Sequence, residues 1–286
     1  MYIYINNQIV RHDQAHISVF DHGFMYGLGL FETFRVYNGH PFLLDDHLQR
    51  LNEGLKQLDI DVQFNREGVL SILHSLLSAN GWQDAYIRFN VSAGIGELGL
   101  STSTYEKPSI IMYAKSLHGV SFSSKKVVSL KINRNTPEGP IRLKSHHYMN
   151  NILAKKEIGN DSSIEGLFYT AEGYVAEGVV SNVFWVKENT LFTPDIGTGI
   201  LNGVTRQFVK SIANKLGLPI IEGYFTKKDV LEADEMFLTN SIQEILPVIS
   251  YDACEFKLCD ESITVAIQNE YTQGIQSMFS RKDIES

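Results

Sequence analysis

A lysine and a glutamate stand in two short segments whose residue types could carry out chemistry. Lys144 lies in IRLKSHHYMNN, and Glu177 lies in GYVAEGVVSNVFW. Two further segments follow, GILNGVTRQFV at 199–209 and LTNSIQEILPV at 238–248. Together the four segments supply an amine, a carboxylate and two turns that could bind an anion. They therefore predict one composite site.

The residues around Lys144 indicate a largely enclosed amine, because apolar side chains such as Leu143 and Met149 flank it on both sides. Burial lowers the pKa of a lysine, since desolvation disfavours the ammonium form. A neutral amine is the form that attacks an aldehyde to make a Schiff base. Taken alone, the segment would be read as an ordinary surface lysine.

The other three segments could hold the remaining parts of a cofactor. Glu177 lies between a turn and an apolar strand, where its carboxylate could bond a pyridine nitrogen. Gly203-Val204-Thr205 opens a helix, and the free N–H groups and positive dipole end of a helix bind phosphate. Thr239-Asn240-Ser241 could add hydroxyl groups. A lysine amine and a partner for the pyridine nitrogen are what a protein supplies to pyridoxal 5'-phosphate. Separately, each segment could be a plain turn or helix cap.

Two arginines are candidate anion ligands. Arg50 shares a helix face with His47 at a spacing of three residues, and its planar guanidinium matches phosphate oxygens. Arg88 is charged within the otherwise apolar run AYIRFNV, where a buried charge would need a partner. It could bind a substrate carboxylate, form a structural ion pair or occupy an exposed edge position. His146 and His147 adjoin Lys144, and we expect a structural role for both.

Composition excludes several classes of protein. The chain has 286 residues, 43% of them hydrophobic, and a net charge of −8 without any Lys/Arg-rich block, so no nucleic-acid partner is expected. The nine histidines show no metal-binding spacing, so no metal is expected, and Cys254 and Cys259 are read as reduced thiols. The absence of a signal-like N-terminus or a long apolar run predicts a cytoplasmic protein without a membrane partner.

Residues 94–99, GIGELG, match the glycine pattern of dinucleotide-binding loops. That fingerprint also needs a helix opening at the third glycine. The polar stretch LSTSTYEKP follows instead. We therefore expect a mobile glycine loop that borders an active site.

Hydrophobic spacing predicts the elements that must position these residues. Residues 2–10 form a hairpin that turns at Asn6-Asn7, and a strand at 30–37 turns at Asn38-Gly39. Leucines at helical spacing predict a helix with Asp45 or Asp46 as its N-cap. Further helices are expected at 69–79, 150–158, 205–216 and 227–232, and further strands at 85–93, 109–114, 126–132, 166–171, 174–178, 183–187 and 235–240.

This order of elements predicts an α/β protein of the α+β type, with mixed sheets and flanking helices. We expect a smaller N-terminal domain at 1–116, a polar linker at 117–126 and a larger C-terminal domain at 127–286.

With these segments in this order, the chain resembles the class IV, fold-type IV, pyridoxal-phosphate enzymes from its first hairpin to about Val248. The resemblance implies a two-domain homodimer with pyridoxal 5'-phosphate between the domains. It also implies a role for each candidate residue. Lys144 is the Schiff-base lysine, Glu177 is the partner of the pyridine nitrogen, and the phosphate ligands are Arg50, Val204, Thr205 and Ser241. The substrate contacts are Arg88, Ile242 and Phe31.

The family contains branched-chain aminotransferases, D-amino acid aminotransferases and 4-amino-4-deoxychorismate lyases. The loop 92–100 lacks the Arg-x-His carboxylate trap of the D-amino acid enzymes. FETFR and SHHYMNN match the branched-chain enzymes only in part. The general similarity is greatest to the lyases, which implies a small-molecule substrate and the formation of 4-aminobenzoate and pyruvate. A branched-chain or other transaminase is the alternative, and a non-catalytic binding protein on this fold is a third hypothesis.

Overall fold

The computed structural model describes residues 1–117 and 124–285, and the chain divides into two compact units. The first unit comprises Met1–Gly119, Leu143–His147 and Ile275–Asp283. The second comprises Val120–Arg142, Tyr148–Gly274 and Ile284–Ser286. The short segment that carries Lys144 therefore belongs to the N-terminal unit.

The expected domain bounds, 1–116 and 127–286, stay a prediction. Residues 118–123 of the expected linker lie outside the described residues. Strand β7 begins at Lys125, within the last two residues of the expected linker.

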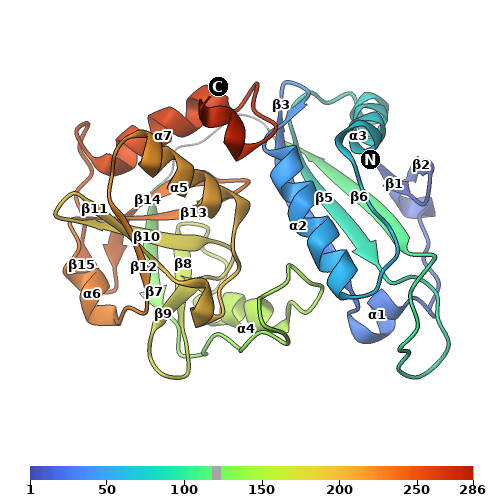
Figure 1. Cartoon of the computed structure of the whole chain (residues 1–286), viewed down its shortest axis with the longest axis horizontal. Helices are drawn as coiled ribbons and strands as arrows, with labels where there is room; N and C mark the ends of the chain where they lie inside the picture. The colour runs from blue at the N-terminus through green and yellow to red at the C-terminus, as the bar shows by residue number, and fades with distance from the viewer. Residues whose placement is uncertain (118–123, 286) are drawn as a thin grey trace. The chain divides into compact units, whose positions relative to one another are not determined.

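The first unit is built on a six-stranded antiparallel sheet in the order β2-β1-β6-β5-β3-β4 (Figure 1). Helix α2 lies alongside β3 and β5 in that view. The elements of this unit are β1 (Tyr2–Ile5), β2 (Gln8–Arg11), α1 (His22–Tyr26), β3 (Gly29–Tyr37), β4 (His40–Pro41), α2 (Leu44–Gln57), α3 (Arg66–Asn80), β5 (Ala85–Ser92) and β6 (Ser109–Ser116).

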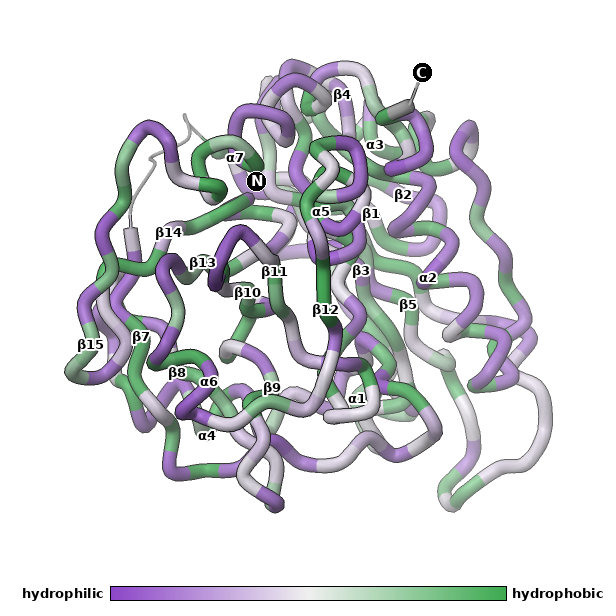
Figure 2. The backbone as a smooth tube through the Cα atoms, turned by 60° about the vertical axis from the view of Figure 1, so that its left-hand side comes forward, coloured by the Kyte–Doolittle hydropathy of each residue, from purple (hydrophilic) through white to green (hydrophobic). Residues whose placement is uncertain are grey.

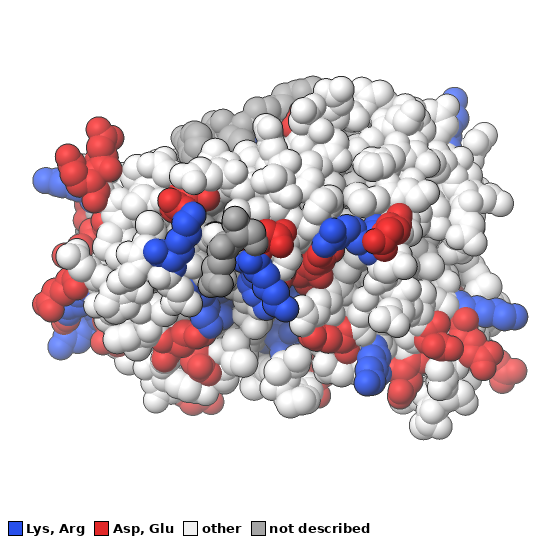
Figure 3. Space-filling model, turned by 45° about the horizontal axis from the view of Figure 1, so that its top comes forward, with Lys and Arg blue, Asp and Glu red and all other residues white. Residues whose placement is uncertain are grey.

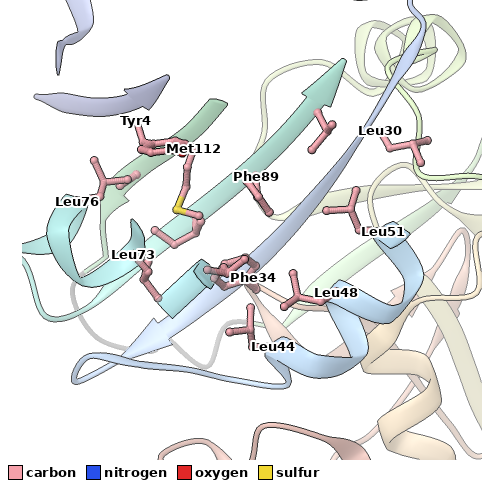
Figure 4. Close-up of a cluster of buried hydrophobic side chains, with 14 of the residues drawn as sticks. Tyr4, Leu30, Phe34, Leu44, Leu48, Leu51, Leu73, Leu76, Phe89 and Met112 are labelled. Atoms are coloured by element: carbon pink, nitrogen blue, oxygen red, sulfur yellow. The ribbon is translucent and has the colours of Figure 1, made fainter. Parts of the chain in front are cut away.

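The core of the first unit lies between one face of this sheet and the helices α2 and α3. Side chains alternate between the two faces of a strand, and burial along β5 alternates accordingly. Figure 4 shows Leu48 and Leu51 of α2, Leu73 of α3 and Phe34 and Phe89 of the sheet converging in this core. The opposite face of β3 and β5 carries Phe31, Arg88 and their neighbours.

The local turns of the first unit follow their sequence in most places. Asn6 and Asn7 have positive φ in the first hairpin, as do Asn38 and Gly39 in the second, so both expected turns are confirmed. The expected N-cap of α2 was wrong. Leu43 occupies the cap without a side-chain bond, because Asp45 pairs with Arg66 and Asp46 with Arg281.

The second unit is built on a nine-stranded mixed sheet in the order β12-β11-β10-β13-β14-β7-β8-β9, with β15 paired to β14. The pairs β11/β12, β14/β7 and β7/β8 are parallel and the other pairs are antiparallel. Its strands are β7 (Lys125–Ser129), β8 (Ile164–Tyr169), β9 (Val175–Gly178), β10 (Asn182–Lys187), β11 (Thr190–Pro194), β12 (Ile220–Gly223), β13 (Glu235–Asn240), β14 (Glu244–Tyr251) and β15 (Cys254–Glu255).

Four α-helices pack against this sheet, namely α4 (Met149–Ile158), α5 (Val204–Lys215), α6 (Lys227–Leu231) and α7 (Ile263–Gly274). Helices α5 and α7 contact each other and β13, whereas α4 contacts β8. Apolar residues of β10, β13 and β14 form the core that Val230 of α6 completes. The expected α/β class is thus confirmed, although only the second sheet is mixed.

The distribution of apolar and charged residues agrees with the composition. In Figure 2, hydrophobic and hydrophilic residues alternate along α2, as an amphipathic helix requires. On the face drawn in Figure 3, acidic and basic side chains are interspersed rather than separated by sign. Within the part of the chain that the structure describes, no helix combines the length and hydropathy that a membrane span needs.

Candidate active site

The Lys144 segment lies against the edge of β3. The N–H of Phe31 donates to the carbonyl of Lys144 at 2.9 Å, and the N–H of His146 donates to the carbonyl of Gly29 at 3.0 Å. Leu30 and Ser145 form an antiparallel bridge between these bonds. The segment therefore extends the sheet by a short stretch, which fixes the direction in which Lys144 projects.

Phe31 brings three of the expected site residues together. The Nζ atom of Lys144 lies 4.4 Å from the centre of the Phe31 ring, and the guanidinium carbon of Arg88 lies 3.6 Å from it. The ring itself is 2% exposed. A cation over an aromatic face is attracted by the ring quadrupole. The first unit thus holds an amine and a guanidinium on one buried aromatic ring.

Arg50 lies on the other side of the same sheet, because Glu32 and Phe31 are neighbours on β3 and face opposite sides. Arg50 donates from Nε and Nη2 to the two oxygens of Glu32, at 2.7 and 2.6 Å. His47 Nδ1 bonds the same carboxylate at 2.6 Å. This network leaves the Arg50 side chain 18% exposed.

The charges of this buried network are strongly coupled. Burial would raise the pKa of Glu32, but the adjacent Arg50 guanidinium and the His47 hydrogen bond lower it to about 2. Burial lowers the pKa of His47 below its ordinary value. A neutral His47 that donates from Nδ1 to an ionised Glu32 agrees with the lowered pKa of both residues. Arg50 is then the cation of the network.

Glu177 lies on β9 and is 5% exposed. Its carboxylate accepts from Arg134 Nε at 2.9 Å, from the N–H of Leu201 at 3.0 Å and from Asn182 at 3.3 Å. Arg142 lies 3.9 Å from it. A buried carboxylate needs such partners, and these hold Glu177 in one orientation.

Arg142 is an unusual neighbour for this carboxylate. Burial, followed by the charge of Arg134, lowers the pKa of Arg142 to about 10, while Glu177 and Glu138 oppose that change. Two guanidinium groups therefore share the surroundings of one buried glutamate.

The start of α5 has the features of an anion-binding turn. Gly203 is the N-cap without a side-chain bond, and a Cβ there would lie 2.2 Å from Asn182 Oδ1, so the backbone must approach closely. The hydroxyls of Thr205 and Ser241 lie 3.2 Å apart. Val204, the first residue of α5, is buried. These donors are of the kind that bind a phosphate.

A buried hydroxyl near this turn lacks a hydrogen-bond partner within the described residues. Thr239 is 1% exposed, and its Oγ1 atom forms no hydrogen bond with the residues that the structure describes. Its strand partner is Asn182, which itself packs against Gly203. An unsatisfied buried hydroxyl is costly, so a ligand group that reached it would remove that cost. Ile242, by contrast, donates its N–H to Asn240 Oδ1 at 3.0 Å, which engages the backbone group expected to bind substrate.

The glycine loop after β5 is held by the start of α1. Residues 97–108, all of which the structure describes, contain no helix. His22 bonds the Glu97 carbonyl and the Tyr105 hydroxyl, both at 2.9 Å. A Cβ at Gly96 would lie 2.4 Å from the His22 ring. The loop and His22 line a cavity of about 520 Å³. Its place at the border of an active site stays a prediction.

No cluster of metal ligands occurs in the described ranges 1–117 and 124–285. Cys254 and Cys259 are both free. The candidate residues thus form three groups. Lys144, Phe31 and Arg88 share one face of the first sheet, Arg50 lies on the other face, and Glu177, Val204, Thr205, Ser241 and Ile242 belong to the second unit.

Residues 29–251 match the model of the family described as amino-transferase class IV. The chain belongs to the class IV aminotransferase family. The resemblance expected from the four segments is therefore confirmed, and enzymes of this family depend on pyridoxal phosphate.

Three similar proteins bear on the finer assignment. An aminodeoxychorismate lyase of Bacillus subtilis (strain 168) is 44% identical over 98% of this chain and 97% of that protein. The crystal structure of 4-amino-4-deoxychorismate lyase from Pseudomonas aeruginosa has a TM-score of 0.85 at 26% identity, with 96% of this chain and 99% of that chain covered. The crystal structure of a branched-chain aminotransferase from Thermoproteus uzoniensis with norvaline has a TM-score of 0.86 at 28% identity, with 98% and 97% covered.

Sequence reasoning missed the residues that hold the candidate groups in place. Glu32, Asn90 and Arg134 each bond a candidate residue directly. Glu32 could have been noticed, because a charged residue in the apolar strand LFETFRV needs a partner, as Arg88 does. Arg134 and Arg142 lie in an irregular segment whose sequence has no periodicity to read.

Proposed function

We propose that this chain is a pyridoxal-phosphate-dependent lyase that converts 4-amino-4-deoxychorismate to 4-aminobenzoate and pyruvate. The observation that carries the proposal is the 44% identity to an aminodeoxychorismate lyase over nearly the whole of both chains. The local geometry supports it, because the Lys144 amine and the Arg88 guanidinium each lie over the Phe31 ring. The substrate carries carboxylates that such a guanidinium would bind.

The residues present fit the cofactor. The paired hydroxyls of Thr205 and Ser241, the unpartnered Thr239 hydroxyl and the open turn at Gly203 suit a phosphate group. When bound, pyridoxal phosphate supplies an aldehyde that condenses with amines and a ring that accepts electrons. Lys144 would hold the aldehyde carbon, Glu177 the pyridine nitrogen, and Arg50, Val204, Thr205 and Ser241 the phosphate.

Lys144 would then act as a base, because it is the amine that the incoming substrate amine displaces. It would take the proton from the amine-bearing carbon of the substrate, which requires the Lys144 amine to lie within hydrogen-bond reach of that proton. The bond from the ring to the enolpyruvyl oxygen breaks, and a proton delivered to the leaving group completes pyruvate. The product ring becomes aromatic, which favours this direction. Atoms balance without water or an oxidant.

Glu177 and Arg88 would act without transferring protons to the substrate. Glu177, fixed by Arg134 and the N–H of Leu201, would favour a protonated pyridine nitrogen. Arg88 would bind a substrate carboxylate through its guanidinium fork.

The experiment is a pair of product assays on the purified protein supplied with pyridoxal phosphate. One assay offers aminodeoxychorismate and measures 4-aminobenzoate and pyruvate in equal amounts. The other offers leucine with 2-oxoglutarate and measures glutamate. Formation of glutamate at the higher kcat/KM would replace the lyase by the branched-chain transaminase. Borohydride reduction that fixes no cofactor to the protein would support a non-catalytic binding protein.

A cytoplasmic location stays a prediction.

We also propose that the protein is a homodimer. Large apolar side chains are exposed around α1 and the glycine loop, including Val19 and Phe24 at 70%, Leu98 at 77% and Leu100 at 89%. They share one surface, because Gly96 bonds the Phe20 carbonyl and Gly99 bonds the Tyr26 hydroxyl. Sedimentation should give a dimer for the native chain and a monomer for Phe24→Lys with Leu98→Lys. A native monomer at micromolar concentration would contradict the proposal.

A further inference from the structure

Arg88 is connected to His146 through a single amide side chain. Arg88 Nε donates to Asn90 Oδ1 at 2.8 Å, and Asn90 Nδ2 lies 3.1 Å from His146 Nε2. Residues 88 and 90 are two apart on β5 and share one face of the sheet. His146 is the second residue after Lys144. The chain of contacts therefore runs from the carboxylate-binding candidate to the lysine segment.

The direction of both hydrogen bonds is fixed by chemistry. Arginine can only donate, so the atom of Asn90 that faces it is the carbonyl oxygen. The amide nitrogen then faces His146 and donates, so Nε2 of His146 must accept. His146 is therefore neutral, with its proton on Nδ1. Burial, followed by the charge of Arg88, lowers the pKa of His146 to about 4, in agreement with this assignment.

The connected residues Arg88, Asn90 and His146, here called the relay, leave the charge of Arg88 uncompensated. Neither an asparagine nor a neutral histidine carries a negative charge, and no carboxylate within the described ranges pairs with Arg88. Three other arginines with little exposed surface, Arg50, Arg134 and Arg206, differ in this respect. Their carboxylate partners are Glu32 for Arg50, Glu177 for Arg134 and Glu222 for Arg206.

The Phe31 ring is the platform on which the relay acts. The Arg88 guanidinium lies 3.6 Å from the ring centre, and His146 stacks on the same ring at 6.3 Å with an interplanar angle of 28°. A Cβ at Gly29 would lie 2.6 Å from the His146 ring, so glycine makes room for this stacking. With its face on Phe31 and its Nε bonded, Arg88 has one orientation.

We propose that Asn90 and His146 are positioning residues that hold the Arg88 guanidinium, uncompensated, beside Lys144 for a carboxylate of an amine-bearing substrate. The inference rests on the proposed function only in taking that carboxylate to be the substrate's. An arginine held by neutral partners offers its full charge and its remaining N–H edge to an anion. The two residues would thus determine selectivity for carboxylate-bearing ligands without touching the ligand.

The first experiment measures binding to the cofactor-loaded protein by calorimetry. The probes are 4-aminobenzoate and aniline, which differ by one carboxylate. His146→Phe keeps an aromatic ring but removes the acceptor, and His146→Gln restores an acceptor. His147→Phe is the matched control, because His147 bonds the Tyr26 carbonyl and lies outside the relay.

We expect His146→Phe to weaken binding of 4-aminobenzoate by about tenfold, because an incorrectly oriented charge-assisted hydrogen bond loses most of its strength. His146→Gln should recover most of that loss, and His147→Phe should bind as the native protein does. Binding of aniline should be the same in all four proteins. Equal loss for both probes, or none for either, would overturn the proposal.

A second variant keeps the test informative if His146→Phe does not fold. Asn90→Asp preserves the acceptor for Arg88 but adds a negative charge that compensates it. We expect 4-aminobenzoate binding to fall by about 100-fold or more, with aniline unaffected. An Asn90→Asp protein that binds 4-aminobenzoate normally contradicts the proposal.

The lyase assay separates this proposal from the proposed function. In that assay, His146→Phe should raise KM for aminodeoxychorismate more than it lowers kcat. If the native protein lacks lyase activity but still shows the carboxylate-selective binding pattern, the proposed function fails and the relay stands. If the native protein is an active lyase whose KM is insensitive to both variants, the relay fails and the function stands.

Discussion

The amine of Lys144 lies 4.4 Å from the centre of the Phe31 ring. Residues 31 and 144 are far apart in the sequence, and a backbone hydrogen bond at 2.9 Å ties them together. This contact places a reactive amine on the sheet face that also carries Arg88. It explains why a five-residue segment, Leu143–His147, is part of the N-terminal unit.

Lys144→Ala should abolish turnover, because no other amine among the described residues is placed on the Phe31 ring to hold the cofactor or to move the substrate proton. Losing a positioned base alone typically costs about 10²–10⁴-fold. Borohydride reduction followed by peptide mapping should label Lys144 in the native protein and no single lysine in the variant. Lys155→Ala, on α4, is the control and should behave as the native protein. Labelling of another specific lysine would refute the assignment.

Glu177→Gln should lower kcat by roughly 10²-fold or more, because a neutral amide stabilises a protonated pyridine nitrogen poorly. The hydrogen bond from Leu201 can persist, so the fold and cofactor loading should be retained. The measurement is kcat for the fully loaded protein together with its absorbance spectrum. Glu172→Gln, an exposed turn residue, is the matched control. A loaded variant with normal kcat would remove Glu177 from the site.

Arg50 should bind the cofactor phosphate, and its removal should weaken cofactor binding by about 1.5–3 kcal/mol, or about 10–100-fold in Kd. Arg50→Met alone would leave Glu32 buried without its cation. The sharper test is Arg50→Met combined with Glu32→Gln, compared with Glu32→Gln alone. The Kd for pyridoxal phosphate, from fluorescence titration, should differ between these two proteins. An equal Kd would assign Arg50 to structure only.

Glu32 should make the protein sensitive to acid. The pKa of Glu32 is lowered to about 2 in the folded chain. The stability that Glu32 contributes is therefore complete at a pH above the ordinary pKa of a glutamate, and it is lost as the pH falls toward about 2. Between pH 5 and pH 3 the loss should be about 2 kcal/mol. Urea unfolding at both pH values should show this difference in the native protein. Glu32→Gln should be less stable at pH 6, and its free energy of unfolding should lack this part of the decrease between pH 5 and pH 3.

Arg88→Met should change substrate preference. Methionine keeps an apolar contact with Phe31 but loses the cation. We expect kcat/KM for aminodeoxychorismate to fall more than kcat/KM for any monocarboxylate amino acid that the protein accepts. The ratio of the two values in the native and variant proteins is the measurement. An unchanged ratio in a folded variant would leave Arg88 with a structural role and weaken the case for the lyase.

The sequence by itself determined the features that depend on neighbouring residues. The asparagine and glycine turns of the two hairpins, the helix that begins at Val204 and the strand that carries Glu177 follow local rules of backbone conformation and hydrophobic spacing. Segment order also determined the family. Short strands such as β12 and the helix α7 were missed, because their patterns are too brief or too weakly amphipathic to stand out.

The tertiary structure decided which side chains meet. The sequence left Arg88 between an ion pair and a ligand site, and the fold gave it Asn90 and an aromatic ring instead of a carboxylate. It paired Arg50 with Glu32 and His47 across a helix and a strand, and it placed Arg134 on Glu177 from an irregular segment. The physical reason is that burial penalises each charge until a partner is found, and that partner is chosen by strand register and helix packing rather than by spacing along the chain.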